Sequence, residues 1–188
     1  MKMKVLIAED EQAISMQYQI MLEDRGHEVT ITNDGEECMN VYRTALGSAA
    51  TDHENNDESI ANLESPSILP PFDVVILDYK MPKKDGLVSA MEILELCPSQ
   101  RIMFASAYTV ETLVEAVKNL HRIVELLHKP FDLEYFVDAV EDNSLYEQVE
   151  RLNVRIKELK DYNNFSQSQL VDLLKGAKRL QNLVLYSS

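Results

Sequence analysis

Five polar residues stand at or just beyond the ends of short apolar runs, and their types suit phosphoryl chemistry. They are Glu9, Asp10, Asp78, Ser106 and Lys129. Carboxylates held close together repel one another unless a cation neutralises them, and oxygen ligands of this kind suit Mg²⁺. A carboxylate beside Mg²⁺ and a lysine can attack phosphorus to form an acyl phosphate. A single aspartate in such a position more commonly caps a turn, so this chemistry requires a fold that gathers all five.

The apolar runs predict the strands of one parallel sheet. Four runs are short and mostly apolar, as is typical of strands covered on both faces: residues 5–8, 74–77, 101–105 and 123–127. Val29 and Ile31 alternate with polar neighbours, as in a strand at the edge of a sheet. Strands and helices therefore alternate five times, which predicts an α/β fold with a doubly wound, five-stranded parallel sheet. The carboxyl ends of such strands meet at one edge, where ligands bind.

Helix boundary signals lie between these runs. Gly26 suits the position after the first helix, and Asp34 with an acid three residues later suits the start of the second. Gly47 is expected to end that second helix. A fourth helix is expected over residues 110–120, and Asp132 is expected to cap the last one.

The negative charge of the chain is concentrated in residues 1–142. They hold 27 of the 32 acidic residues and 11 of the 18 basic ones, whereas residues 143–188 carry a slight positive balance. This shift predicts one domain over 1–142 and an appendage after it. The acidic body argues against nucleic-acid binding by its general field, because such binding depends on neutralising phosphates. Residues 48–70 contain no Lys or Arg and little periodicity, so an acidic surface loop is expected there.

Cysteine usage and hydropathy indicate a cytoplasmic protein. Cys38 and Cys97 have no neighbouring Cys or His pair, so both are expected to be small core or surface residues rather than metal or redox groups. No apolar run approaches the length of about 20 residues that a membrane-spanning helix needs, and no signal-like segment is present.

Four motifs, in order and each at a predicted strand end, resemble the response regulators of two-component signalling. They are Glu9-Asp10, residues 78–86, Ser106-Ala107 and residues 129–131. Residues 1–142 are similar to the receiver domain of that family. The resemblance implies a flavodoxin-like fold with strand order 2-1-3-4-5. It also implies a phosphorylation-switched protein that is no enzyme beyond self-catalysed phosphotransfer and slow autodephosphorylation.

The resemblance implies which residues hold the metal and the phosphoryl group. Asp78 would accept the phosphoryl group from a phosphohistidine on a sensor histidine kinase. Asp10 and Asp78 would bind Mg²⁺, together with the backbone carbonyl of Lys80 and with Glu9 through water.

The resemblance also assigns two further groups around the phosphoryl group. Lys129 would pair first with Asp78 and later with a phosphoryl oxygen, and its bond to Pro130 would be cis. Ser106 would move onto the phosphoryl group, with the small Ala107 leaving access.

Three positions bear on how the family pattern works in this chain. Members of the family usually carry Tyr or Phe three residues before the lysine, but this chain has Leu126. The signal to the surface formed by the fourth helix and fifth strand would then pass through backbone and loop shifts, or be weak. Lys80 and Tyr108 occupy places that influence loss of the phosphoryl group in similar proteins. A solvated lysine and a packed tyrosine explain these two residues equally well.

The appendage over 143–188 is expected to be helical. Apolar residues recur at heptad spacing, which is compatible with a helical hairpin turning near Asn163 or with one coiled-coil helix: Leu145, Val149, Leu152, Ile156, Leu159, then Leu170, Leu173, Ala177, Leu180 and Val184. Such a module would form a homodimer or dock an effector protein, or fold back on its own domain.

Two other classes of function remain open. A DNA-binding transcriptional regulator acting through the C-terminal helices is the first. The second is a hydrolase with an aspartyl-phosphate intermediate, although such enzymes commonly have an acid two residues after the nucleophile, where this chain has Lys80.

Overall fold

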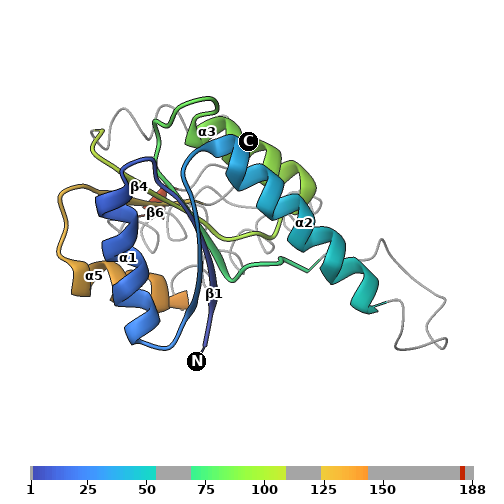
Figure 1. Ribbon diagram of the computed structural model, residues 1–188, viewed down its shortest axis with the longest axis horizontal. Helices are drawn as coiled ribbons and strands as arrows, with labels where there is room; N and C mark the ends of the chain where they lie inside the picture. The colour runs from blue at the N-terminus through green and yellow to red at the C-terminus, as the bar shows by residue number, and fades with distance from the viewer. Residues whose placement is uncertain (1, 54–68, 109–123, 144–182, 185–188) are drawn as a thin grey trace, which may run out of the picture.

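The described residues form one sheet with helices on both faces (Figure 1). The computed structural model describes residues 2–53, 69–108, 124–143 and 183–184. The strand order is β2-β1-β3-β4-β5-β6, and β1 to β5 run parallel. The strands are β1 (Lys4–Ala8), β2 (Glu28–Thr32), β3 (Val74–Leu77), β4 (Ile102–Ser106), β5 (Val124–His128) and β6 (Leu183–Val184). The predicted parallel sheet with order 2-1-3-4-5 is therefore confirmed.

Two pairs of helices cover the sheet. α1 (Gln12–Asp24) and α5 (Leu133–Glu141) lie on one face, and α2 (Gly35–His53) and α3 (Gly86–Leu96) lie on the other (Figure 1). Among the described residues, no helix is both long and apolar enough to cross a membrane. The fourth helix, predicted over 110–120, lies outside the described residues.

Each face of the sheet has its own apolar core. Under α1 and α5, the ring of Tyr18 stacks on Phe136 with centroids 4.4 Å apart. Under α2 and α3, Cys38, Tyr42 and Cys97 are fully buried. Of the core and surface positions that the sequence allowed for the cysteines, both therefore occupy core positions. Strands buried on both faces explain why β1, β3 and β4 are almost continuously apolar.

Helix caps follow the predicted residues at three of four places. Gly26 follows α1 with φ +89°, a conformation that glycine adopts without steric cost. Asp34 accepts hydrogen bonds from the amides of Glu36 and Glu37 at the start of α2. Asp132 accepts from two amides at the start of α5.

The predictions for two segments are wrong. α2 does not end at Gly47 but continues to His53, so residues 48–53 of the expected acidic loop are helical. A glycine costs about 1 kcal/mol inside a helix, and the residues on either side outweigh this cost. Residues 183–184 pair antiparallel with β5 as β6 rather than continuing a helix. Such an edge pairing depends on tertiary contact and leaves no local pattern.

A buried arginine ties the starts of β4 and β5 to the end of α5. The Arg101 guanidinium contacts both carboxylate oxygens of Glu125, at 2.7 and 3.0 Å. It also donates to three backbone carbonyls and one side chain at the end of α5: Ala139, Val140, Asp142 and Asn143. We call these residues the Arg101 cluster. It lies at the opposite edge of the sheet from the strand ends that carry Asp78 and Ser106, and it holds α5 against the sheet.

Candidate functional site

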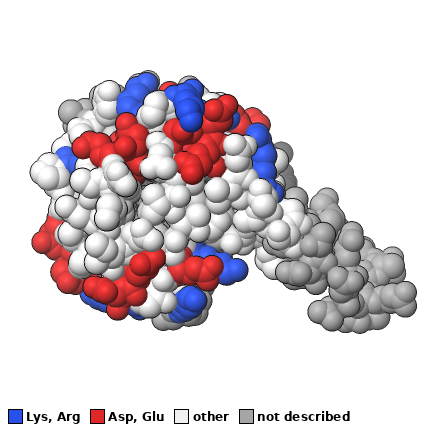
Figure 2. All heavy atoms as spheres, viewed as in Figure 1, with Lys and Arg blue, Asp and Glu red and all other residues white. Residues whose placement is uncertain are grey.

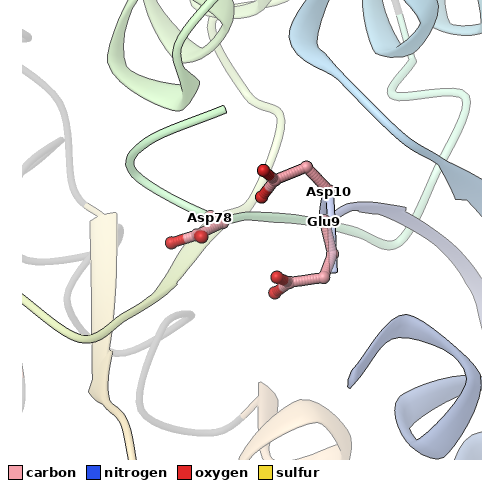
Figure 3. A group of neighbouring side chains, drawn as sticks. All are labelled: Glu9, Asp10 and Asp78. Atoms are coloured by element: carbon pink, nitrogen blue, oxygen red, sulfur yellow. The ribbon is translucent and has the colours of Figure 1, made fainter. Parts of the chain in front are cut away.

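The ends of β1 and β3 place three carboxylates together. The register pairs Ala8 with Leu77, so Glu9, Asp10 and Asp78 are the next residues on two neighbouring strands. The Asp78 amide donates to the Ala8 carbonyl at 2.9 Å, which continues the pairing to the site itself. In Figure 3 the side chains of Glu9 and Asp10 extend from the end of β1 toward the side on which Asp78 lies.

The arrangement of these carboxylates fits a divalent cation. Each of the three residues offers an oxygen, and these oxygens lie within 4.8 Å of one another. Glu9 is only 1% exposed, and its Oε1 is a buried atom for which the described residues provide no hydrogen-bond partner. Unpartnered buried oxygens and clustered negative charge are unfavourable alone, and a hard cation such as Mg²⁺ removes both costs. Along this edge of the molecule, the upper rim of Figure 2, acidic and basic side chains are interspersed.

Lys129 supplies the positive charge of the site. Its ammonium lies 2.5 Å from Glu9 Oε2 and 3.7 Å from Asp78 Oδ2. The expected pairing with Asp78 is therefore present, but the closer contact is with Glu9. The bond from Lys129 to Pro130 is cis, as expected.

Ser106 lies at the end of β4, beside the same edge. It is fully buried, its carbonyl accepts from the Lys129 amide at 2.8 Å, and its hydroxyl accepts from the Tyr108 amide at 3.3 Å. Leu77 pairs with Phe104 in the sheet, so Ser106 is carried just past the level of Asp78. The structure thus brings the ends of β1, β3, β4 and β5 together, as the sequence predicted.

Burial shifts the acid–base equilibria of two carboxylates. Burial raises the pKa of Asp78, while Lys129 and the Tyr79 amide oppose the shift and the charge on Asp10 adds to it. Burial also raises the pKa of Glu9 against the opposing effect of Lys129. Each group therefore gives up its proton less readily than in water, and a bound cation would reverse that tendency.

The loop after Asp78 contains contacts that no sequence pattern indicates. The rings of Tyr79 and Tyr108 meet edge to face with centroids 5.2 Å apart, joining this loop to the segment after β4. The Lys80 ammonium lies 5.3 Å from the Tyr79 ring centroid and 3.6 Å from Asp85. Leu126, at the position of the expected ring, is buried in the core.

Gly86 is a second functional feature that no sequence pattern indicates. A Cβ on this residue would stand 2.0 Å from the Asp78 carbonyl oxygen, which is far inside contact distance. The Asp-Gly pair at 85–86 could have signalled only a turn from sequence. The structure shows that the absence of a side chain lets α3 begin directly against the backbone of Asp78.

Comparisons with known proteins agree with this architecture. A model of the response regulator receiver domain family matches residues 5–141. The transcriptional regulatory protein PdtaR of Mycobacterium tuberculosis is 31% identical over 142 residues, which is 73% of this chain and 55% of that protein. This chain therefore spans about half the length of that relative.

Solved structures support the same fold. The Vibrio cholerae chemotaxis protein CheY4 has a TM-score of 0.54 at 22% identity, covering 75% of this chain and 98% of CheY4. A CheY-like receiver domain protein from Methanospirillum hungatei has a TM-score of 0.55 at 18% identity, covering 80% and 99%. Receiver domains accept a phosphoryl group, bind Mg²⁺ at an acidic cluster and interact with histidine kinases. With its family match over 5–141, its parallel sheet and its acidic group at the ends of β1 and β3, this chain belongs to the response regulator receiver domain family.

Proposed function

We propose that this protein is a response regulator in which Asp78 accepts a phosphoryl group from a sensor histidine kinase. The observation that carries the proposal is the position of Asp78, which shares a site with two other carboxylates while Lys129 lies 3.7 Å from it. In the transfer, an Asp78 carboxylate oxygen bonds to phosphorus as the bond from phosphorus to the kinase histidine breaks. The histidine nitrogen leaves with the electron pair.

Asp10, Asp78 and the Lys80 backbone carbonyl would hold Mg²⁺, with Glu9 acting through water. The ion would supply positive charge that balances the carboxylates and the transferred oxygens. The buried Oε1 of Glu9, which has no hydrogen-bond partner within the described part of the chain, and the three clustered carboxylates support this assignment.

Lys129 and Ser106 would receive the phosphoryl oxygens. The Lys129 ammonium already lies between Glu9 and Asp78, so a small movement away from Glu9 brings it to a phosphoryl oxygen. The Ser106 hydroxyl accepts a hydrogen bond from the Tyr108 amide, which leaves its own proton free to be donated. Positive charge and a hydroxyl donor would stabilise the added oxygens.

The output of the switch would be protein contact in the cytoplasm. The receiver surface and residues 143–188 would carry it, as a homodimer or with an effector protein. Of residues 143–188, only Asn143 and residues 183–184 are described.

Acetyl phosphate with Mg²⁺ tests the acceptor directly. We expect intact-mass spectrometry to show one added phosphoryl group on the wild-type chain and none after chelation of Mg²⁺. Asp78→Asn should abolish the addition, because an amide oxygen is a far weaker nucleophile. Asp73→Asn is the matched control, because Asp73 lies at the other end of β3 and accepts from the Lys4 amide. Labelling that persists in Asp78→Asn would refute the assignment.

The raised pKa values of Asp78 and Glu9 predict how Mg²⁺ binding depends on pH. Because Mg²⁺ binds the ionised forms, the shift that it causes in the thermal unfolding midpoint should be larger at neutral pH than at acidic pH. Without Mg²⁺, the contribution of these two carboxyl groups to stability instead falls as pH rises. The folded state holds these two protons more tightly than the unfolded state, so their contribution to stability is present at low pH and is lost as pH rises through the raised pKa values. A Mg²⁺ shift of equal size at both pH values would contradict the prediction.

A further inference from the structure

We propose that Lys83 and Asp34 form a positioning pair that holds the loop after Asp78 in the shape required by the metal site. We call residues 79–85 the acceptor loop. The proposal rests on the Mg²⁺ site proposed above, because the loop carries the Lys80 carbonyl assigned to the ion. Neither residue is assigned to touch the ion or the phosphoryl group.

The backbone conformation of Lys83 indicates that contacts from outside the acceptor loop hold it in place. Lys83 has φ +62°, and it is the sole residue other than glycine with positive φ in the described part of the chain. A side chain makes this left-handed conformation unfavourable, and it persists only where surrounding contacts enforce it. Its ammonium forms one such contact, 2.6 Å from Asp34 Oδ2.

Hydrogen bonds at the start of α2 hold the Asp34 carboxylate in a fixed position, where the acceptor loop can bind it. Its Oδ1 accepts from the amides of Glu36 and Glu37 at 2.9 and 2.8 Å, which caps α2. Its Oδ2 remains for Lys83, and the residue as a whole is buried. The Lys83 ammonium, followed by the amide bonds, holds the pKa of Asp34 below its usual range, so the carboxylate is charged at neutral pH.

Gly35 lets the two segments approach closely. A Cβ there would lie 2.4 Å from both the Lys84 carbonyl oxygen and the Ser89 hydroxyl. The start of α2 is therefore packed directly on the backbone next to Lys83. The ion pair and this backbone contact hold the same part of the loop.

Two ion pairs tie the far part of the loop to the neighbouring helices: Lys84 contacts Glu92 of α3 at 2.7 Å, and Lys83 contacts Asp34 at the start of α2. The start of the loop is fixed by Asp78 in the sheet, and its end by the Gly86 amide, which donates to the Tyr79 carbonyl at 3.0 Å. Between them, the Lys84 amide donates to the Pro82 carbonyl at 2.7 Å. Lys83 ties the far part of the loop to α2, and a change there would tilt the segment that presents the Lys80 carbonyl.

Electrostatics alone and a positioning role predict opposite changes in Mg²⁺ affinity when Lys83 loses its charge. Removing the charge of Lys83 makes the surroundings of the three carboxylates more negative, and a more negative site attracts Mg²⁺ more strongly. A positioning role predicts weaker binding, because groups that orient metal ligands commonly affect affinity about tenfold or more. The sign of the change therefore separates the two explanations.

The test is calorimetric titration of the full chain with MgCl₂. We expect Lys83→Gln to weaken Mg²⁺ binding by about tenfold and Lys83→Arg to restore most of it. Asp34→Asn should also weaken binding while keeping the cap, because the amide oxygen can still accept from Glu36 and Glu37. The double variant should bind no more weakly than the weaker single variant, because both changes break one contact.

A matched control separates this effect from loss of a surface ion pair. Lys2→Gln breaks a 3.5 Å contact with Glu28 at the opposite end of the strands, through a lysine about as exposed as Lys83, and should leave Mg²⁺ binding unchanged. Thermal unfolding in chelator verifies that each variant is folded. Unchanged or tighter binding by Lys83→Gln overturns the inference alone. A wild-type chain that binds no Mg²⁺ overturns the proposed function with it.

Discussion

Replacing Arg101 with methionine is expected to lower the free energy of unfolding by about 3–5 kcal/mol. The substitution removes the partner of Glu125, a carboxylate whose pKa burial already raises against the opposing effect of Arg101. It also removes the donor for the carbonyls of Ala139 and Val140. An uncompensated buried charge and unpaired carbonyls both destabilise the folded state.

Urea denaturation measures this loss, and a second substitution identifies its cause. Arg101→Met with Glu125→Leu should recover much of the stability, because replacing both partners of a buried ion pair is far less costly than breaking it. Arg25→Met is the exposed comparison. Arg25 contacts Glu134 and Glu141 at 2.8 and 3.2 Å but is well exposed, so its loss should be much smaller. If the two single variants are equally stable, the Arg101 cluster does not hold α5.

Gly86→Ala is expected to slow phosphorylation by acetyl phosphate about a hundredfold. The new Cβ would meet the Asp78 carbonyl oxygen at 2.0 Å, so either the start of α3 or the backbone of Asp78 must move. Displacement of a reacting group by about 1 Å is enough for an effect of this size. Stability should also fall, by about 1–3 kcal/mol, as in other overpacked sites.

Gly47→Ala is the matched control for Gly86→Ala. A Cβ at Gly47 would meet no atom within 4 Å, and the residue lies inside α2. This variant should gain about 0.5–1 kcal/mol of stability and phosphorylate at the wild-type rate. Rates are measured by intact mass over time. A wild-type rate in Gly86→Ala would show that the backbone near Asp78 can move without affecting the reaction.

The parts of the site that the sequence predicted are those set by local pattern. Apolar runs that end in polar residues identify strands and their carboxyl ends, so the sequence predicts that Glu9, Asp10, Asp78 and Ser106 lie at one edge of the sheet. The capping roles of Asp34 and Asp132 depend on the adjacent amides alone, and both are confirmed.

The features that escaped prediction depend on residues distant in sequence. Arg101 and Glu125 are 24 residues apart, and each alone resembles a charged residue in a strand that would face solvent. The positive φ of Lys83 has no signature in a lysine, and its partner Asp34 precedes it by 49 residues. Lys129 lies closer to Glu9 than to Asp78, a difference of side-chain geometry that no spacing encodes. Gly47 does not end α2, because its preference for ending a helix is weaker than the preferences of its neighbours for continuing it.

The reactivity of the two buried cysteines would measure how often α2 separates from the sheet. Cys38 and Cys97 are fully buried under α2 and α3, and burial raises the pKa of the Cys38 thiol to about 12. A thiol reagent therefore reacts with Cys38 only in molecules whose α2 has separated from the sheet. The labelling rate of the unmodified chain would report how often that helix detaches. Because Asp34, the partner of Lys83, caps the start of α2, the same rate would reveal whether Mg²⁺ or a phosphoryl group holds the helix more tightly.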